Sequence, residues 1–302
     1  MSHNHAHSTS NRSRLIIAIV IVGVVLLIEI GGALVSGSLA LFADAGHMLS
    51  DLAGLVIALV ATVVAARPAT DRQTFGYQRA EVFGALINGA ILVIVAISVG
   101  IGGISRLVAG VPGDVHSVPM LVVAVIGLTA NIIAMFVLRS GAARSINMRG
   151  AYLEVFGDLL GSIAVIIAAV IILTTGFVQA DALASLLIAV MIVPRAYMLL
   201  RDVVRVLSES APPDTDVARI REHILAEPGV VAVHDVHVWA ITSGAPVFSA
   251  HVVVEPQVFS SGAAGVLLDS LSGCLDEHFD VAHSTFQLEP AEHAEHEDPH
   301  HR

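Results

Sequence analysis

The sequence contains no lysine, a single cysteine and little charge, with 14% charged residues among 302. Cys274 has no second cysteine to pair with, which excludes an intrachain disulfide and fits a reducing compartment. Sparse charge together with 55% hydrophobic residues and a mean hydropathy of +0.81 is typical of polytopic membrane proteins and excludes an ordinary soluble enzyme. The absence of lysine has no functional explanation in the sequence.

Charge is divided unevenly along the chain. Residues 1–206 carry 12 Arg and 10 acidic residues, whereas residues 207–302 carry 3 Arg and 16 acidic residues, so the net charge of −11 divides into +2 and −13. The acidic end is therefore expected to form a separate, water-exposed part. Its charge argues against nucleic acid or an anionic membrane surface as a partner and is compatible with cations.

Six apolar segments each approach the roughly 20 residues that a membrane-spanning helix needs. They cover residues 15–35, 39–66, 82–109, 118–138, 151–175 and 180–200. The first segment lacks a small-residue cleavage site and is followed by further spans, so no cleaved signal peptide is expected. The sequence thus predicts an all-α membrane domain of six transmembrane helices.

The arginines predict the orientation of these spans. All but one of the arginines near the spans flank the same ends: Arg12, Arg14, Arg67, Arg72, Arg79, Arg139, Arg144, Arg149, Arg195, Arg201 and Arg205. Because arginine is enriched on the cytoplasmic side, both termini are expected in the cytoplasm of a multi-pass protein of the inner (plasma) membrane. Arg106, near the outer end of the third span, is the exception and is expected to extend to the interface.

After Pro212 and Pro213 the pattern changes to that of a small water-soluble domain. Helices are predicted at 214–227 and 261–279, and strands at 230–241, 247–255 and 281–288. The order α-β-β-α-β predicts a ferredoxin-like α+β fold with its helices on one face of the sheet. Four parts result: a tail at 1–14, a membrane domain at 15–206, a cytoplasmic domain at 207–290 and an acidic tail at 291–302.

Both tails are polar, rich in histidine and without periodicity, so they are predicted to be disordered. Their histidines are His3, His5, His7, His293, His296, His300 and His301. Two interpretations remain open for them, capture of metal ions or a merely solvated tail.

Two pairs of ionisable residues lie inside apolar segments. His47 and Asp51, like Glu154 and Asp158, are four residues apart and so share one helix face. A charge at bilayer depth costs about 2.5–3.5 kcal/mol on insertion scales, so these groups are expected to serve function. One imidazole and three carboxylates suit a divalent metal of the zinc type. Asp44 shares the face of His47 and is expected either to ligate the metal or to orient its ligands.

Four stretches carry a resemblance to a known family: SGSLALFADAGHMLSD, FGYQRAEVFGALING, NMRGAYLEVFGDLLGSIAVI and HDVHVW. They resemble the cation diffusion facilitator family, in its zinc, cobalt and cadmium efflux branch, over nearly the whole chain. The resemblance implies that His47, Asp51, Glu154 and Asp158 bind the transported metal. Many zinc-selective members have histidine where this chain has Glu154, which makes this ligand set harder. An accessory site of two histidines is not implied, because Gln73 and Tyr77 stand at those positions.

The resemblance also implies a cytoplasmic metal-binding set of His234, His251 and Glu289 in a domain that forms a homodimer. The competing interpretation is that these histidines are ordinary solvated residues. His234 and His237 are three apart on a predicted strand and are therefore expected on opposite faces of the sheet.

The residues predict the mechanism as well. Three carboxylates in a low-dielectric site need a positive charge in every state, and metal ligation needs their deprotonated forms, so metal and protons are expected to exchange. The expected partners are divalent metal ions, protons and lipid, without an organic cofactor or enzymatic activity. A membrane-anchored metal sensor and a membrane-embedded zinc hydrolase remain as alternatives, although the hydrolase lacks an HExxH motif.

Overall fold

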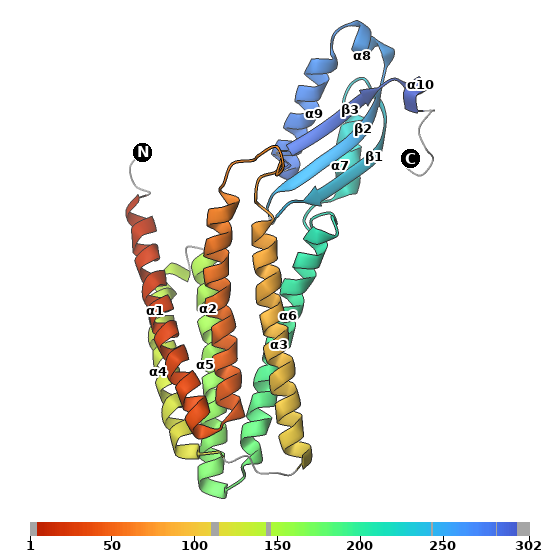
Figure 1. Ribbon diagram of the computed structural model, residues 1–302. Coiled ribbons are helices and arrows are strands. Elements are labelled where there is room, and N and C mark those ends of the chain that lie inside the picture. The colour runs from red at the N-terminus through yellow and green to blue at the C-terminus, as the bar shows by residue number, and fades with distance from the viewer. Residues whose placement is uncertain (1–4, 110–114, 143–145, 243, 282, 295–302) are drawn as a thin grey trace. The chain divides into compact units, whose positions relative to one another are not determined.

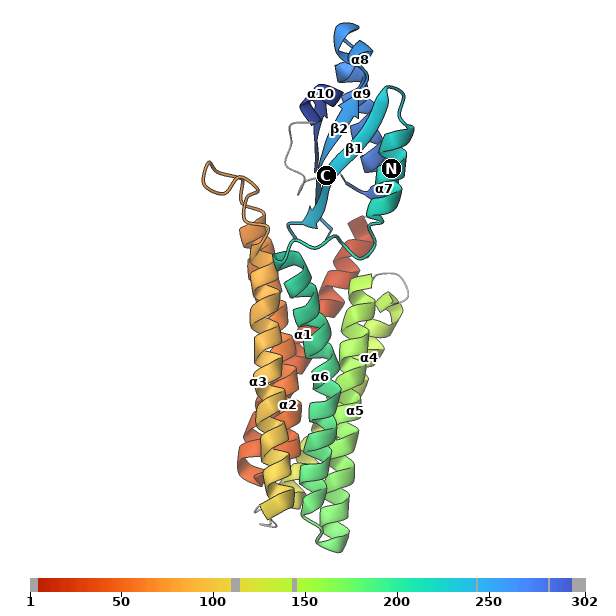
Figure 2. The ribbon, with the colours of Figure 1, turned by 90° about the vertical axis from the view of Figure 1, so that its right-hand side faces the viewer.

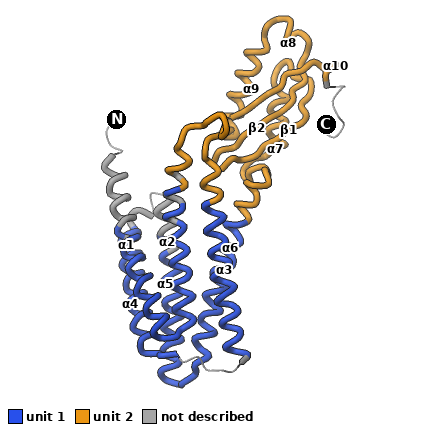
Figure 3. Tube along the Cα trace, viewed as in Figure 1, with its two compact units in different colours: residues 1–60, 84–200 blue, residues 61–83, 201–302 orange. Residues whose placement is uncertain are grey.

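The computed structural model describes residues 5–109, 115–142, 146–242, 244–281 and 283–294. The side chains of residues 5–16, 140–151 and 154, and of several others in these helices, lie outside that description. The chain divides into two compact units, one of residues 1–60 and 84–200, the other of residues 61–83 and 201–302 (Figure 3).

Six long helices lie in the part predicted to span the membrane (Figure 1). They are α1 (His5–Ser36), α2 (Leu39–Ala65), α3 (Ala80–Ala109), α4 (Ser117–Ala142), α5 (Ile146–Thr175) and α6 (Gln179–Leu207). Among the described residues, all except α2 carry a stretch long and apolar enough to cross a membrane. The predicted membrane domain of apolar helices is confirmed.

The first helix begins ten residues earlier than the segment predicted at 15–35. It starts at His5, inside the stretch that the sequence predicts to be a disordered tail. No proline or glycine occurs between His5 and Arg14, so nothing in the sequence breaks the helix there. In the C-terminal tail, the short helix α10 (Ala291–Ala294) contains His293. The tail residues His3, His296, His300 and His301 lie outside the described residues.

The core of the first unit is built largely from small residues. Ala40 and Ala43 of α2, Ala168 and Ala169 of α5 and Ala189 of α6 are among its buried members. Small side chains let helix backbones approach closely, which is how helices associate in lipid. Large apolar side chains such as those of Leu27, Ile94 and Val190 are more than half exposed, as expected of a surface that faces lipid.

One end of the helices is fixed by a buried carboxylate. Asp181 of α6 is fully buried and accepts hydrogen bonds from the backbone N–H groups of Leu39 and Ala40, at 2.8 and 3.1 Å, and from the hydroxyl of Ser38. The guanidinium of Arg106 in α3 also donates to Asp181, over 2.9 Å. Asp181 therefore caps the start of α2 from another helix, and Arg106 contacts a buried anion there.

The second unit contains the predicted small α+β domain. Its elements are α7 (Val217–Ala226), β1 (Val230–Ala240), β2 (Pro246–Val254), α8 (Pro256–Ser260), α9 (Ala264–Phe279) and β3 (His283–Glu289). The strand order is β1-β2-β3, with β2 antiparallel to β1 and parallel to β3. Ile220 and Ile224 of α7 and Leu271 of α9 pack with Phe248 and Val252 of β2 in one core. The helices α7 and α9 lie on one face of the sheet (Figure 2). The predicted single helical layer is confirmed.

The prediction that His234 and His237 lie on opposite faces of the sheet is wrong. His234 pairs with His251 and His237 pairs with Ser249, so three steps along β1 match two steps along β2. This register shift is a β-bulge, and Asp235 within it has a φ of 49°. Because the bulge adds one residue to β1, both histidines lie on the face that the helices leave open.

Candidate functional site

Three of the four predicted transport ligands come together in the first unit. Nε2 of His47 lies 3.8 Å from a carboxylate oxygen of Asp51 and 3.6 Å from one of Asp158. Two ligand atoms each about 2.1 Å from a tetrahedral zinc ion are about 3.4 Å apart, so these distances are close to those of a ligand set. The i,i+4 spacing on α2 and the packing of α2 against α5 bring the groups together.

Both carboxylates of this group are nearly inaccessible to solvent. The side chains of Asp51 and Asp158 are 6% and 3% exposed, and that of His47 is 14% exposed. Glu154 lies on α5 four residues before Asp158, but its side chain is outside the described residues. Asp44 is buried and does not belong to the described group; its carboxylate accepts a hydrogen bond from Ser162 over 3.4 Å.

An arginine holds one of the predicted ligands. Both amino groups of the Arg195 guanidinium in α6 contact Asp51, at 2.8 and 3.0 Å, one to each carboxylate oxygen. In the sequence, Arg195 indicates only the orientation of the sixth span, so this contact with Asp51 is not predicted. The position of Arg195 could have indicated this contact, because Arg195 follows Pro194 inside a helix and lies about three turns before the end of that helix at Leu207. A metal ion at Asp51 must therefore compete with a built-in cation.

The three predicted cytoplasmic ligands also come together, on the open face of the sheet in the second unit. His234 and His251 are paired across β1 and β2, with ring centroids 5.2 Å apart. Glu289 of β3 is buried; its carboxylate contacts Nε2 of His234 and lies 3.7 Å from Nδ1 of His251. Two imidazoles and a carboxylate are borderline and hard ligands that suit zinc and related divalent ions.

Further polar groups surround this set. Gln287 donates to Glu289 over 3.4 Å, and the tail residue His293 lies 3.8 Å from the same carboxylate. Asp235, in the bulge, lies 3.8 Å from His251 and 2.8 Å from His237. The bulge therefore places the carboxylate of Asp235 at the edge of the cytoplasmic set. The alternation of residues along the strand does not predict this position.

The single cysteine is a poor candidate ligand. Partial burial, followed by the neighbouring carboxylates of Glu227 and Glu277, raises the pKa of the Cys274 thiol above its ordinary value. Metal binding needs the thiolate, which a raised pKa makes scarcer at neutral pH. The nearby His223 and His278 each face a backbone carbonyl of α7 or α9.

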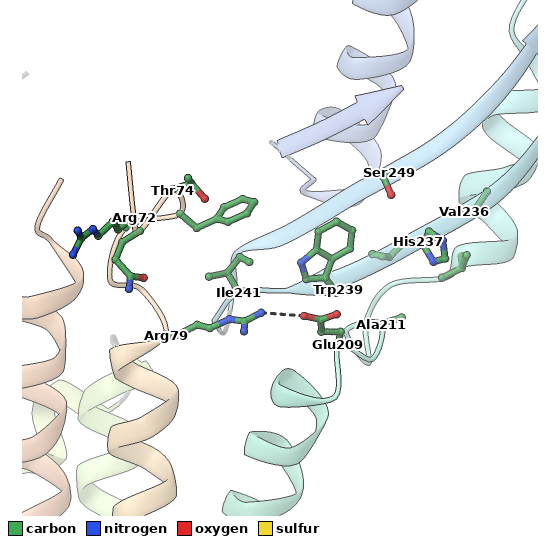
Figure 4. Close-up of a pocket in the computed structure, with 15 residues that line it drawn as sticks. Arg72, Thr74, Arg79, Glu209, Ala211, Val236, His237, Trp239, Ile241 and Ser249 are labelled. Carbon is green, nitrogen blue, oxygen red and sulfur yellow. Dashed lines mark hydrogen bonds and ion pairs between the residues drawn. The ribbon is translucent and has the colours of Figure 1, made fainter. Parts of the chain in front are cut away.

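A pocket of about 760 Å³ also lies within the second unit (Figure 4). Its walls include Arg72, Gln73, His237 and Trp239, and its carboxylate, Glu209, is paired with Arg79 at 3.3 Å. One imidazole and one paired carboxylate do not make a metal site. Gln73 is part of this wall. It stands where some members of the family that the chain resembles have a histidine of an accessory metal site.

Comparisons with known proteins agree along the chain. The family described as "Cation efflux transmembrane domain" matches residues 15–208, and "Cation efflux protein, cytoplasmic domain" matches residues 212–291.

Several curated proteins are similar over nearly their whole length. The chain is 42% identical to the metal cation efflux system protein CzcD of Cupriavidus metallidurans, covering 97% of this chain and 92% of that protein. It is 39% identical to the zinc transporter ZitB of Escherichia coli, with 96% and 93% covered. It is 37% identical to a cadmium, cobalt and zinc/H(+)-K(+) antiporter of Bacillus subtilis, with 97% and 93% covered.

Proposed function

The chain belongs to the cation efflux family, and we propose that His47, Asp51, Glu154 and Asp158 bind the metal ion that it transports. The protein is a multi-pass membrane transporter that exports divalent metal cations such as zinc, cadmium and cobalt in exchange for protons. It is not an enzyme, and the hydrolase and sensor alternatives are not favoured, because the relatives are transporters. The single observation that supports the site is the buried group of His47, Asp51 and Asp158.

Exchange follows from the chemistry of this group. Metal ligation needs neutral imidazole and ionised carboxylates, so a divalent ion can bind only as protons leave. The buried carboxylates then need protons, or another cation, when the metal departs. With both termini in the cytoplasm, as the arginine distribution favours, an inward proton gradient drives metal outward.

A direct test uses purified protein in sealed vesicles with a pH-sensitive dye inside. We expect uptake of zinc, cadmium and cobalt only in vesicles that contain the protein, with protons moving in the opposite direction and uptake that increases with the imposed pH gradient. Manganese serves to test how far the oxygen-rich ligand set widens selectivity. Metal flux that ignores the pH gradient would contradict proton exchange.

Arg195 is proposed to act on this site as a positioning residue. It holds Asp51 in a two-point ion pair, and its side chain is 31% exposed. Arg195→Gln should therefore lower the zinc concentration for half-maximal flux, because no guanidinium competes with zinc for Asp51. It should also slow turnover, because no guanidinium takes the place of the zinc ion when that ion leaves Asp51. A partly exposed ion pair contributes about 1 kcal/mol, which corresponds to about a fivefold shift.

The matched control is Arg195→Lys, which keeps the charge and should restore most of the wild-type behaviour. Arg201→Gln is a second control, since Arg201 is exposed and contacts Asp202. A half-maximal concentration that stays at the wild-type value in Arg195→Gln would rule out competition at Asp51.

The cytoplasmic set is proposed as a regulatory metal site. His234, His251 and Glu289 bind a divalent ion and thereby favour one arrangement of the domain, which raises transport when cytoplasmic metal is high. A homodimer joined through the cytoplasmic domains is part of this proposal, because the second family match covers that domain. The tail histidines, including His5, His7 and His293, are proposed as weak capture points for metal.

A further inference from the structure

A second group of buried polar side chains lies in the first unit, apart from the metal ligands. It consists of Glu29 of α1, Asp44 of α2, Asn131 of α4 and Ser162 of α5, so four helices each contribute one residue. None of the four is more than 1% exposed. Polar residues at this depth are costly and mark functional positions in membrane proteins.

Most oxygens of this group lack a partner. Asn131 donates its amide to the Ser162 hydroxyl over 3.5 Å, and that hydroxyl donates to one oxygen of Asp44 over 3.4 Å. Both oxygens of Glu29, the other oxygen of Asp44 and the amide oxygen of Asn131 accept no hydrogen bond within the part of the chain that the structure describes. A buried carboxylate in that situation is unstable unless a positive charge neutralises it.

The surrounding charges further destabilise an ionised carboxylate at Glu29. The carboxylates of Asp44 and Asp158 both repel that of Glu29. The nearby basic groups, His47 and Arg195, contact Asp158 and Asp51. Two adjacent carboxylates in a low dielectric cannot both be ionised at little cost, so one of them readily holds a proton.

Two glycines show how closely these carboxylates approach the neighbouring helices. A Cβ atom at Gly127 of α4 would lie 2.5 Å from Oε1 of Glu29, and one at Gly161 of α5 would lie 2.4 Å from Oδ1 of Asp44. Only glycine allows such contact. A proton needs no ligand shell, whereas a divalent ion needs at least four donor atoms. Among the described side chains, the groups with three or more metal-binding residues include neither Glu29 nor Asp44.

We propose that Glu29 and Asp44 form a proton-binding site, distinct from the metal ligands, that carries a proton during metal exchange. A hydronium ion gives its proton to one carboxylate and leaves as water, and the reverse step releases the proton on the other side of the membrane. Asp44 lies three residues from His47, and Ser162 lies four from Asp158, so the two sites are about one helical turn apart. This inference rests on the proposed function, because it assigns residues to the proton side of that exchange.

The test uses Glu29→Gln and Asp44→Asn in the full-length protein, since each amide has the shape and neutrality of the protonated acid. In calorimetry, the zinc affinity of Glu29→Gln should stay within about twofold of wild type, because the metal ligands are intact. In vesicles, the number of protons moved per zinc ion should fall, and zinc flux should lose the part of its response to a pH gradient that the metal ligands do not supply. Asp202→Asn, which removes an exposed carboxylate, is the matched control.

A second readout observes the proton itself. Difference infrared spectra of wild-type protein between high and low pH should contain a protonated-carboxyl band that Glu29→Gln or Asp44→Asn removes and Asp202→Asn does not. This measurement needs no transport, so it remains decisive if one variant transports poorly, and either variant suffices if the other fails to fold.

Three results would overturn the proposal: wild-type proton counts in both variants, a carboxyl band that neither variant changes, or a folded variant that no longer binds zinc. Failure of the wild-type protein to move zinc or protons would instead refute the proposed function.

Discussion

Replacing Asp158 by Ala is expected to reduce zinc uptake into vesicles to the level of protein-free vesicles. Asp158 is buried, lies 3.6 Å from His47 and supplies one of four proposed ligands. Loss of a group that merely supports a ligand typically costs 10- to 100-fold in metal affinity, so loss of the ligand itself should cost more than about 100-fold. Asp51→Ala should have the same effect, and it also removes the ion pair between Asp51 and Arg195.

The control for this experiment removes a carboxylate elsewhere. Asp71→Ala eliminates an exposed acid from the segment between α2 and α3 and should transport as wild type does. Circular dichroism and size-exclusion chromatography should show that Asp158→Ala is inserted and folded. Wild-type flux in a folded Asp158→Ala protein would remove Asp158 from the site.

The second large effect is expected in the cytoplasmic domain. The double variant His234→Ala, His251→Ala removes the two proposed imidazole ligands beside Glu289, so the purified full-length protein should bind one divalent ion fewer per chain. The zinc concentration for half-maximal flux should rise, because a bound ion no longer favours the active arrangement of the domain. The size of this rise is limited by the difference between the ion's affinities for the two arrangements. The maximal rate should survive, since the membrane ligands are unchanged.

A matched control removes two other histidines of the same domain. His223 and His278 have ring centroids 5.5 Å apart on α7 and α9, and neither belongs to the proposed set. The double variant His223→Ala, His278→Ala should keep the wild-type number of bound ions. Equal metal stoichiometry in both double variants and the wild type, measured by calorimetry, would exclude the cytoplasmic site and leave the tail histidines as capture points.

The two sites also differ in how they are assembled. In the membrane, His47 and Asp51 are adjacent on one helix face, so half of the ligand set exists as soon as α2 forms. In the cytoplasmic domain, each ligand comes from a different strand, and the set exists only when the sheet is complete. Destabilising the sheet should therefore abolish metal binding there while leaving the membrane site intact.

The sequence by itself determined the features that depend on short-range patterns. Apolar length predicted the helices of the membrane domain, alternation predicted β1, β2 and β3, and the i,i+4 spacing predicted that His47 and Asp51 share a face. These features depend on hydrophobic period and backbone geometry, which are local properties of the chain. The family resemblance supplied the assignment of His234, His251 and Glu289, which no local pattern could have joined.

Only the tertiary structure decided which charges meet. In the sequence, Arg195 indicates the cytoplasmic end of the sixth span, yet in the structure it contacts Asp51, 144 residues away. Glu29 stands among apolar residues in the sequence, yet in the folded chain the carboxylate of Asp44 repels it and a Cβ atom at Gly127 would lie 2.5 Å from its Oε1. The bulge at Asp235 reversed the predicted face of His237 relative to His234. The reason is the same in each case: helix packing and strand register bring together residues that are distant in the chain, and no periodicity encodes those contacts.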